Sequence, residues 1–321
     1  MRAVQVVEPE GPSSVRVQEV DPPVRGDGEV LIDVAAAGVN FPDLLLTRGL
    51  YQYKPDPPFT LGSECAGTVR EAAPGSRFSP GDRVVAFTMS GVFAEVVSVP
   101  EATVLPLPDE VGFAAGACLP MNYLTAHFTL AVRGGMRAGE TVLVHGAAGG
   151  VGTAVVQLAA ALGATVIGVT STEAKAEVAR RAGAAHAVGA DGFKDAVKEL
   201  TGGAGVDMVV DPVGGDRFTD SLRSLAPLGR LMVVGFTAGD IPTVRVNRLL
   251  LNNIDVRGVG WGAYALPRED FVRSAWDELL PHLRSGALDP LISERFGLDG
   301  AGEALSRLDT RTVTGKVVLE V

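Results

Sequence analysis

Cysteine, basic charge and long hydrophobic runs are all scarce in this chain of 321 residues. Its two cysteines, Cys65 and Cys118, are too few for a disulfide framework or for a zinc site of four thiolates. The 28 basic residues are outnumbered by 38 acidic ones, and the net charge of −10 argues against broad binding to nucleic acid or to anionic membranes. Apolar runs such as Thr141–Val144 are far shorter than the roughly 20 residues of a transmembrane helix. Because Met1–Glu10 also has no signal-peptide core, we expect a cytoplasmic protein.

Hydrophobic residues make up 46% of the chain and charged residues 21%, which suits a folded protein long enough for two domains. The first part, up to Pro108, has β-branched segments separated by glycine and proline turns. These segments include Val30–Val34, Arg83–Phe87 and Phe93–Val99. The pattern predicts a partly open β-barrel.

A second pattern begins at Thr141, where short apolar strands alternate with alanine-rich helices. This alternation is typical of a parallel sheet with helices on both faces. Strands are predicted at Thr141–Gly146, Thr165–Thr170, His186–Val188, Val206–Val213, Arg230–Phe236 and Asp255–Trp261. Helices are predicted at Gly150–Leu162, Glu173–Ala182, Phe193–Leu200 and Arg217–Leu225. Six strands in this order predict a doubly wound Rossmann domain.

The chain beyond Tyr264 predicts a helix at Glu269–Arg284, a strand at Leu291–Phe296, another helix and a final strand at Lys316–Val321. We expect these elements to return to the first domain. The predicted fold is therefore α/β, with a partly open β-barrel domain made of residues 1–120 and 265–321 and an inserted Rossmann domain of residues 121–264.

A glycine-rich turn joins the first Rossmann strand to the helix after it, in the segment Val142–Gly152. Glycine lets the backbone turn tightly and approach a pyrophosphate, while the N-terminus of the helix offers free N–H groups and the positive end of its dipole. The turn departs from the G-x-G-x-x-G pattern at one place, where Ala147 replaces the first glycine. The predicted cofactor contacts are Ala147, Ala148, Gly149, Gly150, Val151 and Gly152.

The tip of the second Rossmann strand indicates which nicotinamide cofactor is used. NAD-binding proteins usually place an acidic residue there to accept both ribose hydroxyls. This chain has Thr170 and Ser171 instead, which leave room for a 2′-phosphate, and Lys175 follows one helical turn later. Glu173 is nearby, and a lone lysine on a helix is most often a solvated surface residue. The placement of Lys175 nevertheless predicts NADPH as the cofactor.

Several segments together resemble one family. They are the turn at Ala147–Gly152, the segment Gly38–Asp43, the run Leu61–Gly67, the stretch Leu119–Ala126 and the ending Gly315–Leu319. Over nearly its whole length the sequence is similar to the zinc-independent quinone oxidoreductases of the medium-chain dehydrogenase/reductase superfamily, the zeta-crystallin-like group. The resemblance implies a GroES-like catalytic domain, a Rossmann NADPH-binding domain and a homodimer formed through the last Rossmann strand, here Asp255–Gly260.

The positions that hold catalytic zinc in related alcohol dehydrogenases look different in this chain. The superfamily's zinc enzymes place a Cys, a His and a second Cys there, and the matching positions are Asn40, Ser63 and Met121. None of these side chains replaces a thiolate or an imidazole on zinc, and the four histidines show no pair at metal-ligand spacing. We therefore expect no metal. Without a Lewis acid, the acceptor has to bring its own electron demand, as a quinone, an enone or an enoyl thioester does.

The resemblance also suggests roles for individual residues. Asn40 would lie beside the nicotinamide and the substrate, with Asp43 and Tyr51 near the same place as the rest of the catalytic set. Four further residues match cofactor contacts of the family: Thr125, Gly235, Phe236 and Lys316. Structural roles stay open for all of them, because Asx side chains often bond to local backbone in turns and Tyr51 lies in a proline-rich loop.

Three functions remain open on the sequence. The first is NADPH-dependent reduction of a quinone. The second is reduction of an enoyl thioester or an alkenal, and a coenzyme A thioester would favour basic residues such as Arg245 and Arg248 for its phosphates. The third is a structural or RNA-binding protein that binds the cofactor without catalysis, against which the acidic charge balance argues. We take quinone reduction as the main prediction, with neither membrane nor nucleic acid as a partner.

Overall fold

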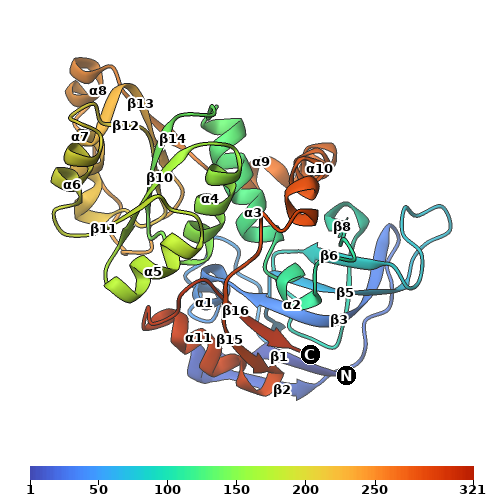
Figure 1. Ribbon diagram of the computed structural model, residues 1–321. Coiled ribbons are helices and arrows are strands. Elements are labelled where there is room, and N and C mark those ends of the chain that lie inside the picture. Colours follow the sequence, from blue (N-terminus) through green and yellow to red (C-terminus); the bar gives the residue numbers. More distant parts are fainter. The chain divides into compact units, whose positions relative to one another are not determined.

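Two compact units make up the computed structural model, which describes residues 1–321 (Figure 1). The first unit consists of Met1–Asn122, Glu269–Arg284 and Asp289–Val321. The second unit consists of Tyr123–Arg268 and Ser285–Leu288. The chain therefore begins the first unit, builds the second and returns to complete the first.

Antiparallel pairs dominate the first unit. One sheet has the order β2-β1-β4, and a larger sheet has the order β15-β16-β3-β5-β6-β8, with β7 also paired to β3. The strands are β1 (Arg2–Val6), β2 (Val15–Glu19), β3 (Glu29–Val39), β4 (Phe59–Thr60), β5 (Glu64–Glu71), β6 (Arg83–Phe87), β7 (Val96–Pro100), β8 (Val104–Pro106), β15 (Ile292–Gly297) and β16 (Lys316–Glu320). The helices are α1 (Phe41–Leu46), α2 (Phe113–Gly116), α10 (Glu269–Arg284) and α11 (Ala301–Asp309), and α3 (Pro120–His127) begins here. The partly open β architecture expected from the sequence is confirmed.

Alternating apolar residues of these strands build the core of the first unit. On β3, for example, Val30, Ile32 and Val34 are buried in it. α10 joins this unit through Trp276, whose fully buried indole donates a hydrogen bond to the Pro106 carbonyl at 3.0 Å. Losing such a side chain to alanine costs about 3–5 kcal/mol. This contact therefore anchors α10 to strands that precede it by more than half the chain.

β3 is the strand on which the polar residues of the first unit converge. β16 lies antiparallel on one side, with Val317 opposite Val39, and β5 lies on the other, with Glu64 opposite Gly38. Asn40 directly follows β3 and precedes α1. Neighbouring strand registers therefore bring residues from three distant parts of the sequence to one end of β3.

A six-stranded parallel sheet forms the centre of the second unit, in the order β11-β10-β9-β12-β13-β14. Its strands are β9 (Thr141–His145), β10 (Thr165–Thr170), β11 (His186–Gly189), β12 (Val206–Asp211), β13 (Leu225–Val233) and β14 (Asp255–Gly258). Its helices are α4 (Gly150–Ala161), α5 (Glu173–Arg181), α6 (Phe193–Leu200), α7 (Phe218–Arg223), α8 (Asn247–Asn252) and α9 (Trp261–Ala265). α4 and α5 pack on one face of the sheet, and α6 and α7 on the other (Figure 1). The doubly wound Rossmann sheet is confirmed.

Several local features differ from the sequence prediction. β13 begins at Leu225 and ends at Val233, whereas a strand was predicted at Arg230–Phe236. The last Rossmann strand stops at Gly258, because Gly260 turns the chain and the buried Trp261 begins α9. α8 was not predicted. A π-helix at Phe128–Arg133 continues α3, and a single turn of this wider helix leaves no hydrophobic period by which the sequence could reveal it. None of the helices is long and apolar enough to span a membrane.

Candidate functional site

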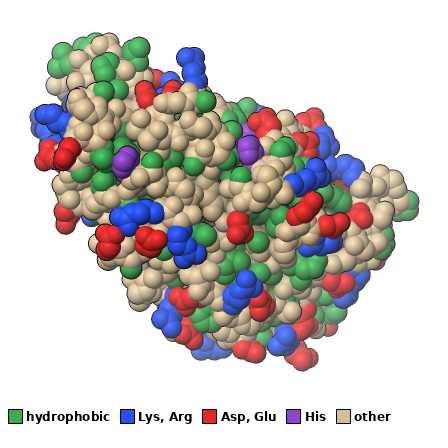
Figure 2. All heavy atoms as spheres, viewed as in Figure 1, with side chains coloured by type: hydrophobic (Ala, Val, Ile, Leu, Met, Phe, Trp, Pro, Cys, Tyr) green, Lys and Arg blue, Asp and Glu red, His purple; other side chains and the backbone are tan.

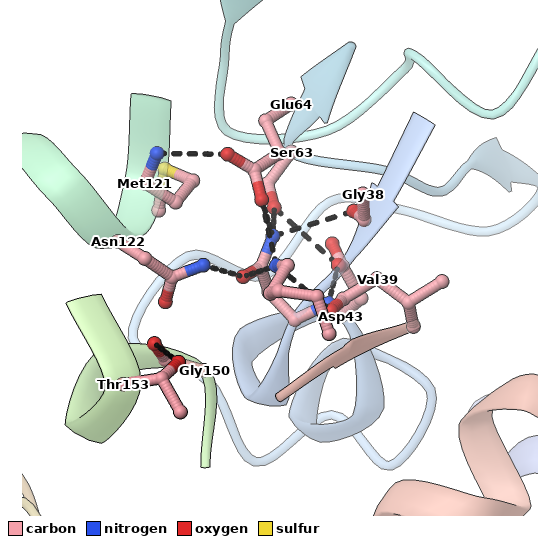
Figure 3. A network of polar contacts seen from close by, with 11 residues as sticks. Gly38, Val39, Asp43, Ser63, Glu64, Met121, Asn122, Gly150 and Thr153 are labelled. Atoms are coloured by element: carbon pink, nitrogen blue, oxygen red, sulfur yellow. Dashed lines mark hydrogen bonds and ion pairs between the residues drawn. The ribbon is translucent and has the colours of Figure 1, made fainter. Parts of the chain in front are cut away.

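A network of buried polar side chains lies at the end of β3 in the first unit (Figure 3). Its members are Asn40, Asp43, Ser63, Glu64 and Lys316, and none is more than 7% exposed. They come from the β3–α1 junction, from β5 and the residue before it, and from β16. Buried polar and charged groups are tolerated only when they are paired, so each contact in the network matters for the whole.

Lys316 supplies the positive charge of this network. Its Nζ donates to the Val39 carbonyl at 3.1 Å, to Asn40 Oδ1 at 2.7 Å and to Glu64 Oε1 at 2.8 Å. An ammonium has three hydrogens, and here each of them has an acceptor within the first unit. Without a cofactor, all three hydrogens of the ammonium are therefore used inside the first unit, and the contact of Lys316 with the cofactor stays a prediction.

The Asn40 amide is held at both of its ends. Its Nδ2 donates to Glu64 Oε1 at 2.9 Å and lies 3.3 Å from Ser63 Oγ. Its Oδ1 accepts from Lys316 Nζ at 2.7 Å and from Asn122 Nδ2 at 3.5 Å. Because donors surround the oxygen and acceptors surround the nitrogen, the amide has one satisfied orientation.

Glu64 is the residue of this network that sequence reasoning missed as a functional one. It is fully buried on β5, and its Oε1 accepts from both Lys316 and Asn40. Its Oε2 accepts from the Met121 N–H at 2.8 Å, in the first turn of α3. An acidic residue among the small apolar residues of Leu61–Gly67 was the available signal, since an ionised side chain in a buried strand needs partners.

Asp43 is completely buried in the first turn of α1. Its Oδ2 accepts from the Asn40 N–H at 2.8 Å and from the Ser63 hydroxyl at 3.4 Å, whereas its Oδ1 has no hydrogen-bond partner. Burial raises the pKa of this carboxyl to about 7, against the lowering effects of the Asn40 N–H, the Lys316 charge and the Ser63 hydroxyl. Asp43 was expected among the catalytic residues. It has no exposed surface in this arrangement, and its contact with the Asn40 N–H fixes the start of α1, so a direct part in catalysis stays a prediction.

Tyr51 is the expected catalytic residue that keeps some contact with solvent. Its ring is half-buried and packs against the core of the first unit. Burial, and then the charge of Asp43, raise the pKa of its phenol above the ordinary value. The phenol therefore stays protonated at neutral pH and keeps a hydrogen to donate.

The three positions that the sequence resemblance matches to zinc ligands meet in this network. Asn40 and Ser63 are in side-chain contact, and the Met121 N–H binds the carboxylate that also binds Asn40. Nowhere in the chain do three or more His, Cys, Asp or Glu side chains gather so that they could hold a metal ion. Cys65 and Cys118 are both fully buried, and burial raises the pKa of each thiol to about 12, so both are neutral packing residues.

The glycine-rich turn of the second unit has the close backbone approach that a dinucleotide site requires. The turn follows β9, and α4 begins at Gly150. A Cβ atom on Gly152 would lie 2.0 Å from the Gly146 carbonyl oxygen, so glycine alone fits there. The N–H groups at the N-terminus of α4, together with its dipole, suit a pyrophosphate. The residues of this turn therefore fit a nicotinamide dinucleotide.

The departure from the glycine pattern at Ala147 is accommodated by the neighbouring strand. Ala147 is fully buried, and Gly168 of β10 lies against it. A Cβ atom on Gly168 would be 2.9 Å from the Cβ atom of Ala147. The methyl group of Ala147 thus occupies the space that a side chain at position 168 would need, and the turn keeps its path.

The tip of β10 presents hydroxyl groups beside a lysine. Thr170 ends the strand, and its buried hydroxyl donates to the Thr172 carbonyl at 3.4 Å. Ser171 is exposed, and the hydroxyl of Thr172 caps α5 by accepting from the Lys175 N–H at 3.3 Å. Glu173, the acidic residue of this region, is paired with Arg180 at 2.7 Å. The side chains at the strand tip are therefore neutral hydroxyls, and the exposed carboxylate of Glu173 faces Arg180.

The remaining expected cofactor residues also belong to the second unit. Thr125 lies on α3, and Gly235 and the partly exposed Phe236 follow β13. Asp211, which the sequence did not single out, ends β12, and its Oδ1 accepts from two backbone N–H groups at 2.9 Å, those of Val213 and Gly214. This carboxylate holds the loop that follows β12 at the carboxyl edge of the sheet, where α/β proteins bind their ligands.

Known protein families match both units. Residues 26–109 match the alcohol dehydrogenase GroES-like domain, and residues 150–282 match the family described as zinc-binding dehydrogenase. The rat (Rattus norvegicus) quinone oxidoreductase-like protein 2 is 39% identical over 311 residues, which are 95% of this chain and 88% of that protein.

Solved structures are similar over the whole chain. A probable oxidoreductase from Mycobacterium abscessus has a TM-score of 0.93 at 42% identity, covering 100% of this chain and 99% of that one. The Escherichia coli quinone oxidoreductase complexed with NADPH has a TM-score of 0.91 at 28% identity, covering 100% of both chains.

The fold and the two sites define a nicotinamide-dependent oxidoreductase with a GroES-like domain and a Rossmann domain. The chain belongs to the medium-chain dehydrogenase/reductase superfamily, among its quinone oxidoreductase-like members. The family resemblance found in the sequence is thereby confirmed.

Proposed function

We propose that this protein reduces a quinone to a hydroquinone with NADPH and without a metal ion. The observation that carries the proposal is the tight turn at Gly152, where a Cβ atom would lie only 2.0 Å from the Gly146 carbonyl oxygen, as in the turns that bind a pyrophosphate. When bound, NADPH supplies a hydride, and a proton completes the two-electron reduction. Asn40, held by Lys316 and Glu64, positions the acceptor, and Tyr51 donates the proton.

The hydroxyl-lined tip of β10 supports NADPH over NADH. An acidic residue there would repel a 2′-phosphate, whereas the exposed hydroxyl of Ser171 can donate to it and Lys175 can pair with it. Lys175→Ala should raise the KM for NADPH about 10-fold or more and leave the KM for NADH nearly unchanged, because a charge-assisted hydrogen bond is worth about 1.5–3 kcal/mol. Lys194→Ala, on α6, is the matched control. An unchanged ratio of the two KM values would remove the assignment.

The residues at the zinc-ligand positions support a metal-free reduction of a conjugated acceptor. An asparagine, a serine and a methionine offer no thiolate or imidazole, and an acceptor that delocalises charge does not need a Lewis acid. The direct test measures NADPH oxidation with benzoquinone, an alkenal and crotonyl-CoA, each with and without chelator. We expect benzoquinone to give the highest kcat/KM and the chelator to have no effect. Loss of activity with chelator would contradict the metal-free mechanism.

One observation favours a second candidate, the reduction of an enoyl thioester. Arg245 is exposed and Arg248 partly exposed near α8, and neither forms an ion pair, so both are available to the phosphates of coenzyme A. If crotonyl-CoA supports a higher kcat/KM than benzoquinone, and Arg245→Ala removes that advantage, the enoyl thioester is the substrate class.

We propose that the edge of the Rossmann sheet forms a homodimer. β14 is the last strand of the sheet order, and apolar residues near it are strongly exposed: Leu228, Ile241, Val246, Leu250 and Leu251 are each at least 72% exposed. Figure 2 shows apolar side chains gathered over α8. Sedimentation should give a dimer that Leu250→Lys weakens and Val24→Lys, in the first unit, does not. A monomeric wild-type protein at micromolar concentration would overturn this part.

A further inference from the structure

We infer that Glu64 and Lys316 are a positioning pair that fixes the direction in which the Asn40 amide points, and that this direction is required for reduction of the acceptor. The inference rests on the proposed reductase function. It assigns a task to two buried charges that neither the glycine-rich turn nor the strand tip explains.

Hydrogen-bond polarity carries the first step. Glu64 has only acceptors, and its three partners, Lys316 Nζ, Asn40 Nδ2 and the Met121 N–H, are all donors. Lys316 has only donors, and it binds Asn40 Oδ1. The amide is therefore clamped with its nitrogen toward the carboxylate and its oxygen toward the ammonium. A reversed amide would place donor against donor and acceptor against acceptor.

Burial of these side chains strongly disfavours the reversed orientation of the Asn40 amide. Glu64 is 0% exposed, and Lys316 and Asn40 are 3% and 7% exposed. Water has little access to compensate a mismatched group, and an uncompensated charge in the interior is strongly destabilising. The pair also reaches the helix that leads into the second unit, because Glu64 holds the Met121 N–H and the adjacent Asn122 contacts Asn40.

Two substitutions distinguish an effect on the orientation of the Asn40 amide from an effect on the packing of the buried network. In Glu64→Gln, the new NH₂ group has to face either the Met121 N–H or the donors of Lys316 and Asn40, so one contact fails. In Lys316→Met, the carboxylate loses its counter-charge. Combined, Glu64→Gln and Lys316→Met remove both charges at similar volume, and the introduced glutamine amide can accept from Met121 while donating to a reversed Asn40 amide. The double variant therefore restores pairing but not direction.

The experiment compares these variants in the full-length protein. Each single variant should lower kcat for quinone reduction about 100-fold, the scale of a misplaced group, with little change in the Kd of NADPH measured by fluorescence. The urea midpoint of each single variant should fall, and that of the double variant should recover toward the wild-type value, while its kcat stays about 100-fold low. The control is Arg230→Met with Glu140→Gln, a largely buried ion pair of 2.5 Å in the second unit, which should leave kcat unchanged.

The outcomes for the double variant distinguish a positioning role of the pair from a purely structural one. If the double variant recovers both its urea midpoint and its kcat, the pair is only structural and the inference fails. It fails equally if either single variant keeps the wild-type kcat. Where a single variant does not fold, the double variant decides alone.

An NMR measurement tests the positioning role independently of the proposed function. The chain has five asparagines, so selective ¹⁵N labelling resolves the side-chain NH₂ signals, and the Asn40 pair is the one lost in Asn40→Asp. These protons should exchange slowly in the wild type and shift markedly in the double variant, whichever acceptor is reduced. An unshifted Asn40 pair would refute the positioning role even if the protein reduces no quinone. Absence of quinone reduction with the expected shift would refute only the proposed substrate.

Discussion

Replacing Asp43 with asparagine should change how the stability of the first unit depends on pH. The wild-type carboxyl is completely buried, and burial raises its pKa from 3.8 to about 7. An asparagine has nearly the same shape and keeps an oxygen to accept from the Asn40 N–H. It removes the proton that titrates and leaves the cap of α1 in place.

The direction and size of the change in stability with pH follow from the raised pKa of Asp43. Because the folded pKa is raised, the folded state binds a proton that the unfolded chain releases above about pH 4, so stability declines as pH rises and the decline ends near pH 7. A shift of about three pKa units corresponds to about 4 kcal/mol in total. Between pH 5 and pH 8 the wild-type protein should lose about 3 kcal/mol through this carboxyl. Asp43→Asn should lose none of it.

The assay needs a probe of the first unit alone, and the two tryptophans supply one. Trp276 is fully buried in the first unit, and Trp261 lies in the second. In a Trp261→Phe background, fluorescence during urea unfolding therefore reports on the first unit. The free energy of unfolding is measured from pH 5 to pH 8 with and without Asp43→Asn, and Asp21→Asn, at an exposed position, is the control.

Subtracting the two pH profiles isolates Asp43. Burial lowers the pKa of His145, so that residue gives a stability contribution which is lost as pH falls, opposite in sign, but it is shared by both proteins. If the profiles of wild type and Asp43→Asn run parallel within about 0.5 kcal/mol, the carboxyl is ionised in the folded state at ordinary pH and the reasoning from burial is wrong.

Three further predictions concern single contacts. Gly152→Ala should weaken NADPH binding at least 10-fold, because its Cβ would meet the Gly146 oxygen at 2.0 Å. Gly112→Ala is the control and should bind NADPH normally, because nothing lies within 4 Å of a Cβ atom there. Equal Kd values from fluorescence titration would count against the proposed turn. Arg230→Met should destabilise the second unit by about 3–5 kcal/mol, because Arg230 binds the Gly134 and Asp207 carbonyls and Glu140. A loss of less than about 1 kcal/mol in the free energy of unfolding, followed by Trp261 fluorescence, would refute this prediction. Tyr51→Phe should lower kcat about 10²-fold or more if the phenol donates the proton, and full kcat across a pH series would exclude that role.

Local patterns explain why the second unit was predictable. The turn at Ala147–Gly152 has its strand, glycines and helix within a few residues, so its chemistry can be read without knowledge of distant contacts. The strand tip with Thr170 and Lys175 is local in the same way. The number of strands and their alternation with helices also predicted the doubly wound fold, because such folds follow few connection rules.

The network of the first unit depends on registers that no local pattern reveals. The family resemblance indicated a place near the cofactor for Lys316, but it did not reveal the bonds of its ammonium to Asn40, Glu64 and the Val39 carbonyl. Glu64 gains its role only when β5 and β16 flank β3. The full burial of Asp43 likewise follows from tertiary packing, which no local pattern reveals.

The bond from Lys316 to Val39 joins residues 277 positions apart, and the entire second unit lies between them. During synthesis, β3 is therefore made long before β16. The end of β3 lacks the Lys316 ammonium until the whole Rossmann sheet has been made. During that interval Glu64 and Asn40 lack their partner, and an apolar strand stays open on one side, the condition that favours association with other chains. Synthesis of the second unit thus sets the minimum time during which this side of β3 lacks β16, and slower synthesis of the second unit would lengthen it.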